Sequence, residues 1–366
     1  MLVGSALPAG YGIPGEGRLP IKHKWKWLAV GALLLAALIW LLRARLAGRG
    51  FDWRIFAATI YGLQWGWLAA SAVAAMACYL GRALRWRVLM RPVKPHPSLW
   101  NLFSATVIGF TATTLLGRAG EFVRPYLIAA REGVPVSSQM AAWVLERIYD
   151  LLIVLAIFGF GLGRVRRSDV KLGPALAWVF ATGGWLVAVL SVATLALLGA
   201  FRHFSANLRR HLLSALSALP EKHFQKAERV ITAFAQGVES TRSSRALLLI
   251  VWYTLIEWAA ITTTTFCVMR AFGRALHFDL LDVLIFLGFL AFGGIVQIPG
   301  VGGGMQVVSV LVLTELFRVP LEVSTSVALV LWIISFVVVV PFGLLLAVHE
   351  GIRWSALKQL EPEASA

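Results

Sequence analysis

The sequence predicts an all-α, polytopic membrane protein, and three observations support this fold class. Of the 366 residues, 59% are hydrophobic and only 14% are charged, whereas an average soluble domain carries about 25% charged residues. Several apolar stretches reach the roughly 17–25 residues that a helix needs to cross a bilayer. The longest hydrophilic stretch runs only from Phe201 to Arg245, so we predict no separate soluble catalytic domain.

Eight apolar segments and one shorter helix follow one another along the chain. The sequence places the segments at 25–42, 58–80, 99–116, 143–163, 174–199, 246–269, 279–298 and 322–348, and the shorter apolar helix at 305–317. Residues 1–20 are rich in Gly and Pro, and we predict that they are disordered. We expect 21–350 to form a single transmembrane domain and 351–366 to be a C-terminal tail.

The basic residues predict topology and partners. The formal net charge is +16, but the basic residues lie mostly in loops beside apolar segments, where they orient spans and attract anionic lipid head groups. We therefore predict membrane phospholipids as partners, and no nucleic acid. The 201–245 loop carries eight Lys/Arg against three Glu, which places it in the cytoplasm. Its apolar spacing favours amphipathic helices on the inner leaflet, and an exposed linker is the alternative.

The sequence predicts neither a metal site nor a cofactor site. Gly10, Gly12 and Gly15 match the dinucleotide-binding pattern GxGxxG, but no strand precedes them and Pro14 interrupts them, so we reject such a site. Cys78 and Cys267 both lie inside apolar segments, with no disulfide framework and no zinc-type spacing. The seven histidines are scattered and form no HExxH motif. We predict no metal and no cofactor.

Two parts of the chain resemble each other. "LLGRAGEFVRPYLI" near residue 120 and "QIPGVGGGMQVVSVLVL" near residue 305 each contain a Gly-rich break and lead into a short helix, a Val-Pro turn and a full span. Pro135 follows Gly117 by 18 positions, and Pro320 follows Gly300 by 20. Helix-breaking glycines at matching places in two halves predict a binding site made from broken helices. Chance similarity between two apolar regions is the alternative.

This repeat favours one topology over another. If 99–116 crossed the membrane completely, the basic 201–245 loop would lie outside, against its charge. If 99–116 instead enters, turns at the glycines and returns, the loop is cytoplasmic and the second Gly-rich segment enters from the opposite face. We therefore predict an inverted repeat with six full spans, two Gly-rich re-entrant hairpins and both termini inside.

The first glycine break carries the first candidate site. Gly117 and Gly120 supply a flexible turn, and the helix that follows offers free N–H groups to an anion. Arg118 and Arg124 can grip a phosphate. Glu121 would favour the helix N-terminus and lies on the same face as Arg124. We predict that these residues bind lipid.

A second charged cluster begins the next span, in "WVLERIYDLL". Glu146, Arg147 and Asp150 are three or four positions apart and form one polar patch. Ionisable residues inside a span are costly and indicate function, so we add them to the lipid-binding set. If the helices pack, three arginines and three carboxylates come together. A purely structural ion-pair network is the alternative.

The second glycine break, "IPGVGGGMQ", has no charge. Its backbone groups could coordinate polar head-group atoms, and close helix packing is the alternative. The residues that we assign to lipid binding here are Pro299, Gly300, Gly302, Gly303 and Gln306.

Together these elements give the chain a family resemblance. Gly117, Arg118, Gly120, Glu121 and Arg124, with the Glu146–Arg147…Asp150 element and the Pro299–Gly300 loop, resemble the lysylphosphatidylglycerol synthase transmembrane-region family, the flippase-like domain of prokaryotic membrane proteins. The resemblance covers about residues 25–350. It implies a lipid-translocating or lipid-handling role in the prokaryotic cell (inner) membrane. Fused members carry a separate aminoacyl-transferase domain that this sequence lacks, so we expect no synthesis of lysyl-lipid by this chain alone.

We therefore expect a flippase or transporter for an anionic or aminoacylated phospholipid. One alternative is a membrane-embedded glycosyltransferase-type enzyme acting on lipid-linked substrates. Another is a scaffold for a partner lipid synthase, and self-association into a homo-oligomer is also open. No nucleophile–base pair stands out, so we name no catalytic residue and favour a protein that is not an enzyme.

Overall fold

The computed structural model describes residues 51–166, 174–202, 214, 221–238, 243–293, 297–298 and 302–350. The chain divides into two compact units, Met1–Asp52 and Trp53–Ala366, and every element below belongs to the second unit. The segment 1–20, the apolar segment 25–42 and the tail 351–366 lie outside the described residues.

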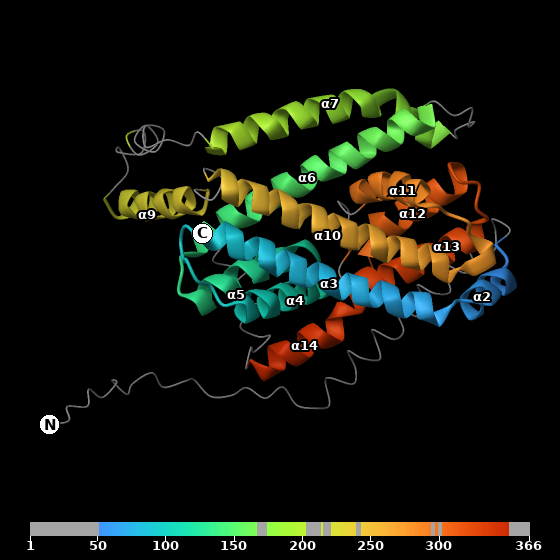
Figure 1. The fold of residues 1–366 in the computed structure, drawn as a ribbon, viewed down its shortest axis with the longest axis horizontal. Coiled ribbons are helices and arrows are strands. Elements are labelled where there is room, and N and C mark those ends of the chain that lie inside the picture. Colours follow the sequence, from blue (N-terminus) through green and yellow to red (C-terminus); the bar gives the residue numbers. More distant parts are fainter. Residues whose placement is uncertain are drawn as a thin grey trace. The chain divides into compact units, whose positions relative to one another are not determined.

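The described part of the second unit is almost entirely helical, which confirms the predicted all-α class (Figure 1). Its elements are α2 (Trp53–Tyr61), α3 (Trp65–Met90), α4 (Leu99–Leu116), η1 (Gly117–Phe122), α5 (Val123–Glu132), α6 (Val136–Arg166), α7 (Pro174–Arg202), α9 (Glu221–Val238), α10 (Ser244–Ala271), η3 (Gly273–Ala275), α11 (Leu280–Gly293), the two-residue strands β1 (Gln297–Ile298) and β2 (Gly302–Gly303), α12 (Gly304–Glu315), α13 (Leu321–Trp332), the π-helical turn η4 (Ile333–Val337) and α14 (Val339–His349).

Six helical stretches are long and apolar enough to cross a membrane, which confirms a polytopic protein. They are Trp65–Met90, Leu99–Glu132, Val136–Val165, Thr182–Gly199, Ser244–Ala271 and Leu321–His349.

The predicted span 58–80 is wrong at both ends. The chain turns between α2 and α3, where the backbone N–H of Gln64 donates to the Ala271 carbonyl at 2.8 Å. Helix α3 then continues to Met90. It passes through Arg82 and Arg85, whose charges are paired with the buried carboxylates of Glu257 and Asp150.

The stretch Leu99–Glu132 does not cross straight through; it folds back as a helical hairpin. Gly117 ends α4 with a φ of 69°, a conformation that favours glycine. The chain returns through η1 and α5 until the Glu132 carboxylate accepts from the backbone N–H of Ser98, at 3.3 Å, and from the Asn101 side chain, at 2.7 Å. At the tip, Gly120 packs on the backbone of Ala112, where a Cβ would overlap it.

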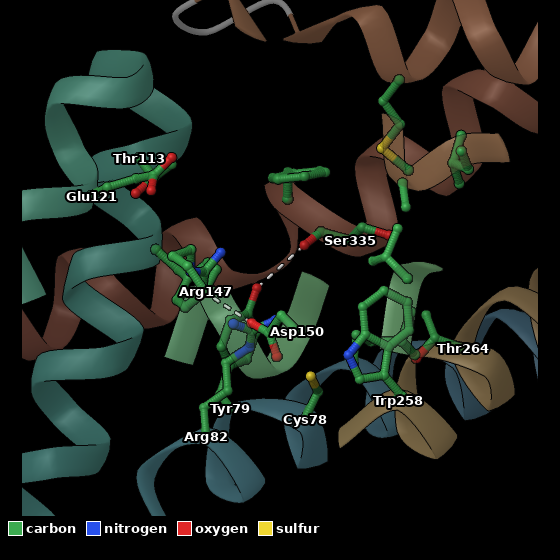
Figure 2. Close-up of a pocket in the computed structure, with 18 of the residues that line it drawn as sticks. Cys78, Tyr79, Arg82, Thr113, Glu121, Arg147, Asp150, Trp258, Thr264 and Ser335 are labelled. Atoms are coloured by element: carbon green, nitrogen blue, oxygen red, sulfur yellow. Dashed lines mark hydrogen bonds and ion pairs between the residues drawn. The ribbon is translucent and has the colours of Figure 1, made fainter. Parts of the chain in front are cut away.

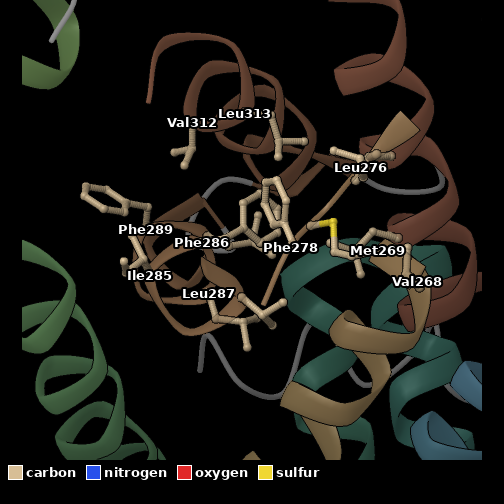
Figure 3. Close-up of a cluster of buried hydrophobic side chains, with 14 of the residues drawn as sticks. Val268, Met269, Leu276, Phe278, Ile285, Phe286, Leu287, Phe289, Val312 and Leu313 are labelled. Atoms are coloured by element: carbon tan, nitrogen blue, oxygen red, sulfur yellow. The ribbon is translucent and has the colours of Figure 1, made fainter. Parts of the chain in front are cut away.

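A second hairpin is built from α11 and α12. Strands β1 and β2 pair antiparallel at its tip, with Gln297 opposite Gly303. At its open end the rings of Phe278 and Phe317 pack in a tilted arrangement with centroids 4.5 Å apart. A core of apolar side chains from α10, α11 and α12 surrounds this hairpin (Figure 3), and a separate core surrounds the first.

The two hairpins enter from opposite ends of α3. Lys94, just beyond the C-terminal end of α3, contacts Glu132 at the open end of the first hairpin, with Nζ and Oε2 2.7 Å apart. The second hairpin follows α10, whose last residue, Ala271, lies beside the N-terminal end of α3. Between these ends, β1 contacts η1, so the hairpin tips meet. Figure 1 shows α4 and α5 toward one end of α3 and α11 and α12 toward the other.

Each hairpin packs on the long span that follows the other hairpin, as expected for two related repeats. Helix α4 of the first hairpin packs on α14 of the last span, and α11 of the second hairpin packs on α6, the span after the first. Helices α3 and α10, which precede the two hairpins, pack along each other. This arrangement supports the predicted repeat, with halves entering from opposite ends.

Helix α9 is the one helix of the 201–245 loop that lies wholly among the described residues. Its Ala233 side chain is buried, whereas Glu228 and also the apolar Val230 are exposed, so the predicted amphipathic character stays a prediction. The helix packs against α6. Contact with the inner leaflet stays a prediction.

Opposite entry of the hairpins can be tested by labelling. His96 and Asp279 are both exposed, near the open ends of the first and second hairpins, while both native cysteines are buried. We expect His96→Cys to react with a membrane-impermeant maleimide from the cytoplasmic face and Asp279→Cys from the other. The unsubstituted protein is the control for native cysteines. Reaction of both variants from one face would contradict the inverted arrangement.

Close packing at the first tip predicts a stability effect. Gly120→Ala should lower the free energy of unfolding by about 1–3 kcal/mol, because rigid backbone must move to admit a methyl group. The control is Gly66→Ala on α3, where an added Cβ meets nothing within 4 Å. We expect Gly66→Ala to be neutral or to stabilise its helix by up to about 1 kcal/mol. Thermal unfolding of the detergent-purified proteins measures the stability of both variants. Equal unfolding midpoints for Gly120→Ala and Gly66→Ala would contradict close packing at Gly120.

Candidate functional site

A cavity of about 510 Å³ lies where the two hairpin tips meet (Figure 2). Its walls come from α3, α4, η1, α5, α6, α10, α11, α12 and η4. Five of the predicted site residues line it: Arg118, Glu121, Arg124, Arg147 and Asp150. The structure therefore brings the two charged sequence clusters together, as the packing hypothesis predicted.

Glu146 is the centre of the charged network behind the cavity wall. Its side chain is fully buried. Four arginines place a guanidinium nitrogen near its carboxylate: Arg124 at 2.7 Å, Arg147 at 2.8 Å, Arg85 at 3.0 Å and Arg82 at 3.3 Å. One carboxylate thus joins α3, α5 and α6.

Two further carboxylates complete the network. Asp150, one turn beyond Glu146, lies 2.7 Å from Nη1 of Arg85 and 3.4 Å from Nη2 of Arg147. Glu257 on α10 is fully buried and lies 2.6 Å from Arg82 and 3.0 Å from Arg85. The Thr254 hydroxyl on α10 also accepts from Arg85, at 3.1 Å. Burial of so many charges is tolerable only because they are paired.

Aromatic faces support the arginines. The Arg124 guanidinium carbon lies 4.2 Å from the centroid of the Trp86 ring, and that of Arg82 lies 4.6 Å from the Phe110 ring. The Trp86 indole is held by a hydrogen bond of 2.9 Å to Gln139. Cation–π contacts of this kind strengthen when the cation is desolvated, so they help to keep the guanidinia in the cavity wall.

Several donors at the cavity have no acceptor among the described residues. They are Nη1 of Arg124, Nε of Arg147 and Nε1 of Trp258. Arg124 is 4% exposed, and an unsatisfied buried donor costs the full desolvation of that group. Because these three atoms are themselves buried, an acceptor on a ligand would reach them only after a small shift of the side chains.

The last span contributes an irregular wall. Residues 333–337 form a π-helical turn, and Ser335 and Phe336 line the cavity. The Tyr79 hydroxyl donates to the Ser335 carbonyl at 3.2 Å, and the Thr114 hydroxyl donates to the Phe336 carbonyl at 3.3 Å. Single π-turns inside helices occur frequently at functional sites.

The first glycine break differs in detail from the prediction. Glu121 pairs with Arg118, 3.9 Å away, and not with Arg124, which instead reaches Glu146. The reason is that residues 117–122 form a 3₁₀ turn and α5 begins only at Val123, so Glu121 does not open the helix. Gly117 and Gly120 act as a turn and as a close packing point.

The second glycine break is described only in part. Pro299 and Gly300 lie outside the described residues. Gly302 and Gly303 form β2, and the Gly303 N–H donates to the Gln306 side-chain oxygen at 2.7 Å. Gln306 therefore caps α12, and lipid binding by these five residues stays a prediction.

Sequence reasoning missed Arg82, Arg85 and Glu257. A signal was present, because Arg82 and Arg85 lie three positions apart near apolar residues and Glu257 interrupts the apolar segment 246–269. Charges inside a span indicate function or pairing. Ending the predicted segment at residue 80 hid the two arginines.

Metal binding has no cluster to support it in this part of the chain. The described residues contain no group of three or more His, Cys, Asp and Glu side chains that could hold a metal ion.

Comparison with known proteins assigns the family. The family described as the lysylphosphatidylglycerol synthase TM region matches residues 28–343, and the chain belongs to it. The chain is 25% identical over 319 residues to a UPF0104 membrane protein of Methanothermobacter thermautotrophicus, covering 85% of this chain and 88% of the relative. It is also 26% identical over 230 residues to a protein named glycosyltransferase AglD of Haloferax volcanii. That match covers 56% of this chain and only 36% of the relative. No solved structure matches the chain.

The network predicts a large effect of losing its central carboxylate. Glu146→Gln should lower the free energy of unfolding by about 3–5 kcal/mol, because buried arginines lose their shared partner. Glu228→Gln makes the same chemical change on the exposed face of α9 and should stay within about 0.5 kcal/mol of the unsubstituted protein. Thermal unfolding in detergent compares the two. Equal stability of both variants would mean that the network does not hold the helices together.

Proposed function

We propose that the protein is a transporter of the flippase type, which moves an anionic or aminoacylated phospholipid across the cytoplasmic membrane of a prokaryotic cell. The observation that carries this proposal is the arginine-lined cavity at the meeting point of two broken-helix hairpins that enter from opposite ends. Transporters bind substrate at such repeat interfaces, and alternating access follows from movement of one repeat against the other.

The chemistry of the cavity supports a phosphate-bearing substrate. Arg124 and Arg147 line the wall with donors that lack an acceptor among the described residues. Guanidinium groups recognise phosphate through paired hydrogen bonds. The rest of the lining includes apolar side chains such as Ile261, Leu287 and Leu290, which suit the apolar part of a lipid.

A second function, glycosyl transfer to a lipid-linked substrate, has one observation in its favour. One relative is named a glycosyltransferase, although this chain covers only 36% of its length. The carboxylates that such a reaction would use, Glu146 and Asp150, are held by arginines. This pairing leaves them poorly placed to act as a base, so we favour transport.

The transport proposal predicts that Arg124 is required. In liposomes with the purified full-length protein, labelled phospholipids should move between leaflets, and Arg124→Gln should slow this movement about tenfold or more, the effect of losing a hydrogen bond to a charged group. Arg124→Lys keeps the positive charge but loses the planar guanidinium that can form two parallel hydrogen bonds, and this variant should retain part of the rate of lipid movement.

The matched control is Arg270→Gln. Arg270 is exposed near the end of α10, and its guanidinium contacts the Phe266 ring rather than the cavity. We expect the Arg270→Gln variant to move lipid at the same rate as the unsubstituted protein. If no lipid moves although the protein is folded, transport is wrong, and sugar transfer or scaffolding of a lipid synthase takes its place.

A further inference from the structure

We infer that the ligand of this cavity is a phosphodiester with a single negative charge and no positively charged head group. This inference rests on the proposed function and narrows it, because transport alone allows anionic and aminoacylated lipids alike. Three observations support it. They are the balance of charges around the cavity, the hydrogen-bonding groups that already have partners, and the separation of the charged wall from the apolar wall.

The charges around the cavity leave an excess of one positive charge. Among the described residues, the network and the wall contain five arginines, Arg82, Arg85, Arg118, Arg124 and Arg147, and four carboxylates, Glu121, Glu146, Asp150 and Glu257. Arginine stays charged in proteins. Each carboxylate lies within 4 Å of a guanidinium. A ligand with one negative charge would balance this formal excess, because complementary charges on the two sides of a binding contact favour the right partner.

The carboxylates that already pair with arginines disfavour a cationic head group. Glu121, the least tightly held of them, has Arg118 3.9 Å away. Glu146 already has four arginine partners, and Asp150 and Glu257 have two each. An ammonium group entering the cavity would have to displace a guanidinium from one of these carboxylates and leave it buried without a partner. On the described residues that line the cavity, the groups without a hydrogen-bond partner are donors, Nη1 of Arg124, Nε of Arg147 and Nε1 of Trp258, and a donor cannot accept a hydrogen bond from an ammonium group.

The two sides of the cavity orient such a ligand. In Figure 2, Arg147, Asp150 and Arg82 lie together near α6 and α3, whereas Trp258 and Thr264 lie on the opposite side, on α10. Beside that second side the wall includes Leu287 and Met305 of the second hairpin. A phosphate at the arginine side would therefore direct its attached chain toward α10 and the second hairpin. A cavity of about 510 Å³ is in the range that holds one drug-sized ligand, enough for a phosphodiester and part of a chain.

The test compares lipids that differ by one unit of charge. Native mass spectrometry of the purified full-length protein would measure binding of phosphatidylglycerol, which carries one negative charge, zwitterionic phosphatidylethanolamine and cationic lysyl-phosphatidylglycerol. We expect phosphatidylglycerol to bind about tenfold more tightly than either of the others, roughly the effect of one charge-assisted hydrogen bond. Equal or tighter binding of the lysyl lipid would overturn the inference.

Charge-altering variants test whether the cavity causes the preference. Arg147→Gln removes the excess charge at a side chain that is 41% exposed, and the preference over phosphatidylethanolamine should then fall to about twofold or less. Arg270→Gln makes the same charge change outside the cavity and should keep the full preference. Should Arg147→Gln fail to fold, Glu121→Gln, which raises the excess to two, should increase the preference instead. An unchanged preference in the folded cavity variant would overturn the inference.

A competition experiment with a water-soluble compound distinguishes a lipid ligand from a free phosphodiester. Glycerophosphoglycerol carries the same phosphodiester without acyl chains, and it should compete weakly with phosphatidylglycerol. Competition as strong as that of the lipid would overturn the lipid orientation across the cavity. Transport of all three lipids at one rate, without selective binding, would refute this inference and leave the transporter standing. Selective binding without any transport would refute the transporter and leave the charge selectivity standing.

Discussion

The structure depends on one constraint: buried charges in an apolar protein must be paired within the protein. Glu146 satisfies four arginines at once, and in doing so ties α3, α5 and α6 together. Glu257 extends the pairing to α10. Water cannot solvate these groups at such burial, so each lost partner leaves an unpaired charge. The network therefore fixes the positions of the helices, and the cavity wall follows from those positions.

The same constraint explains where irregular backbone is placed. Backbone that leaves a helix at membrane depth is tolerated only where protein or a wet cavity satisfies it. The 3₁₀ turn at 117–122 contacts strand β1 (Gln297–Ile298), which pairs with β2 (Gly302–Gly303). The 3₁₀ turn and the π-turn at 333–337 both line the cavity. Tyr79 and Thr114 donate to carbonyls of the π-turn. The interruptions that create the cavity are thus stabilised by the residues that surround it.

A site between two oppositely entering hairpins also has a mechanical consequence. Each half of the molecule contributes a hairpin that packs on the long span of the other half, so neither half can shift without altering contacts at the tips. The arginines belong mainly to the first half and to α3, while the apolar wall belongs mainly to α10 and the second hairpin. Relative movement of the halves would therefore change the contacts of a ligand's phosphate and of its chain together.

The sequence by itself determined the class of the protein and much of its outline. Segment length and hydrophobicity are local properties, so they predicted a polytopic helical protein, and helix-breaking glycines predicted both hairpins. The charged motifs at Arg124 and Glu146 predicted a candidate site, and the structure joins them in one ion pair beside the cavity. Only the tertiary structure decided which charges pair, because pairing depends on which helices are neighbours. Arg85 on α3 meets Glu257 on α10, far away in the chain, and Arg124 meets Glu146 instead of the nearby Glu121. Distance in space, which the sequence does not encode locally, sets these electrostatic energies.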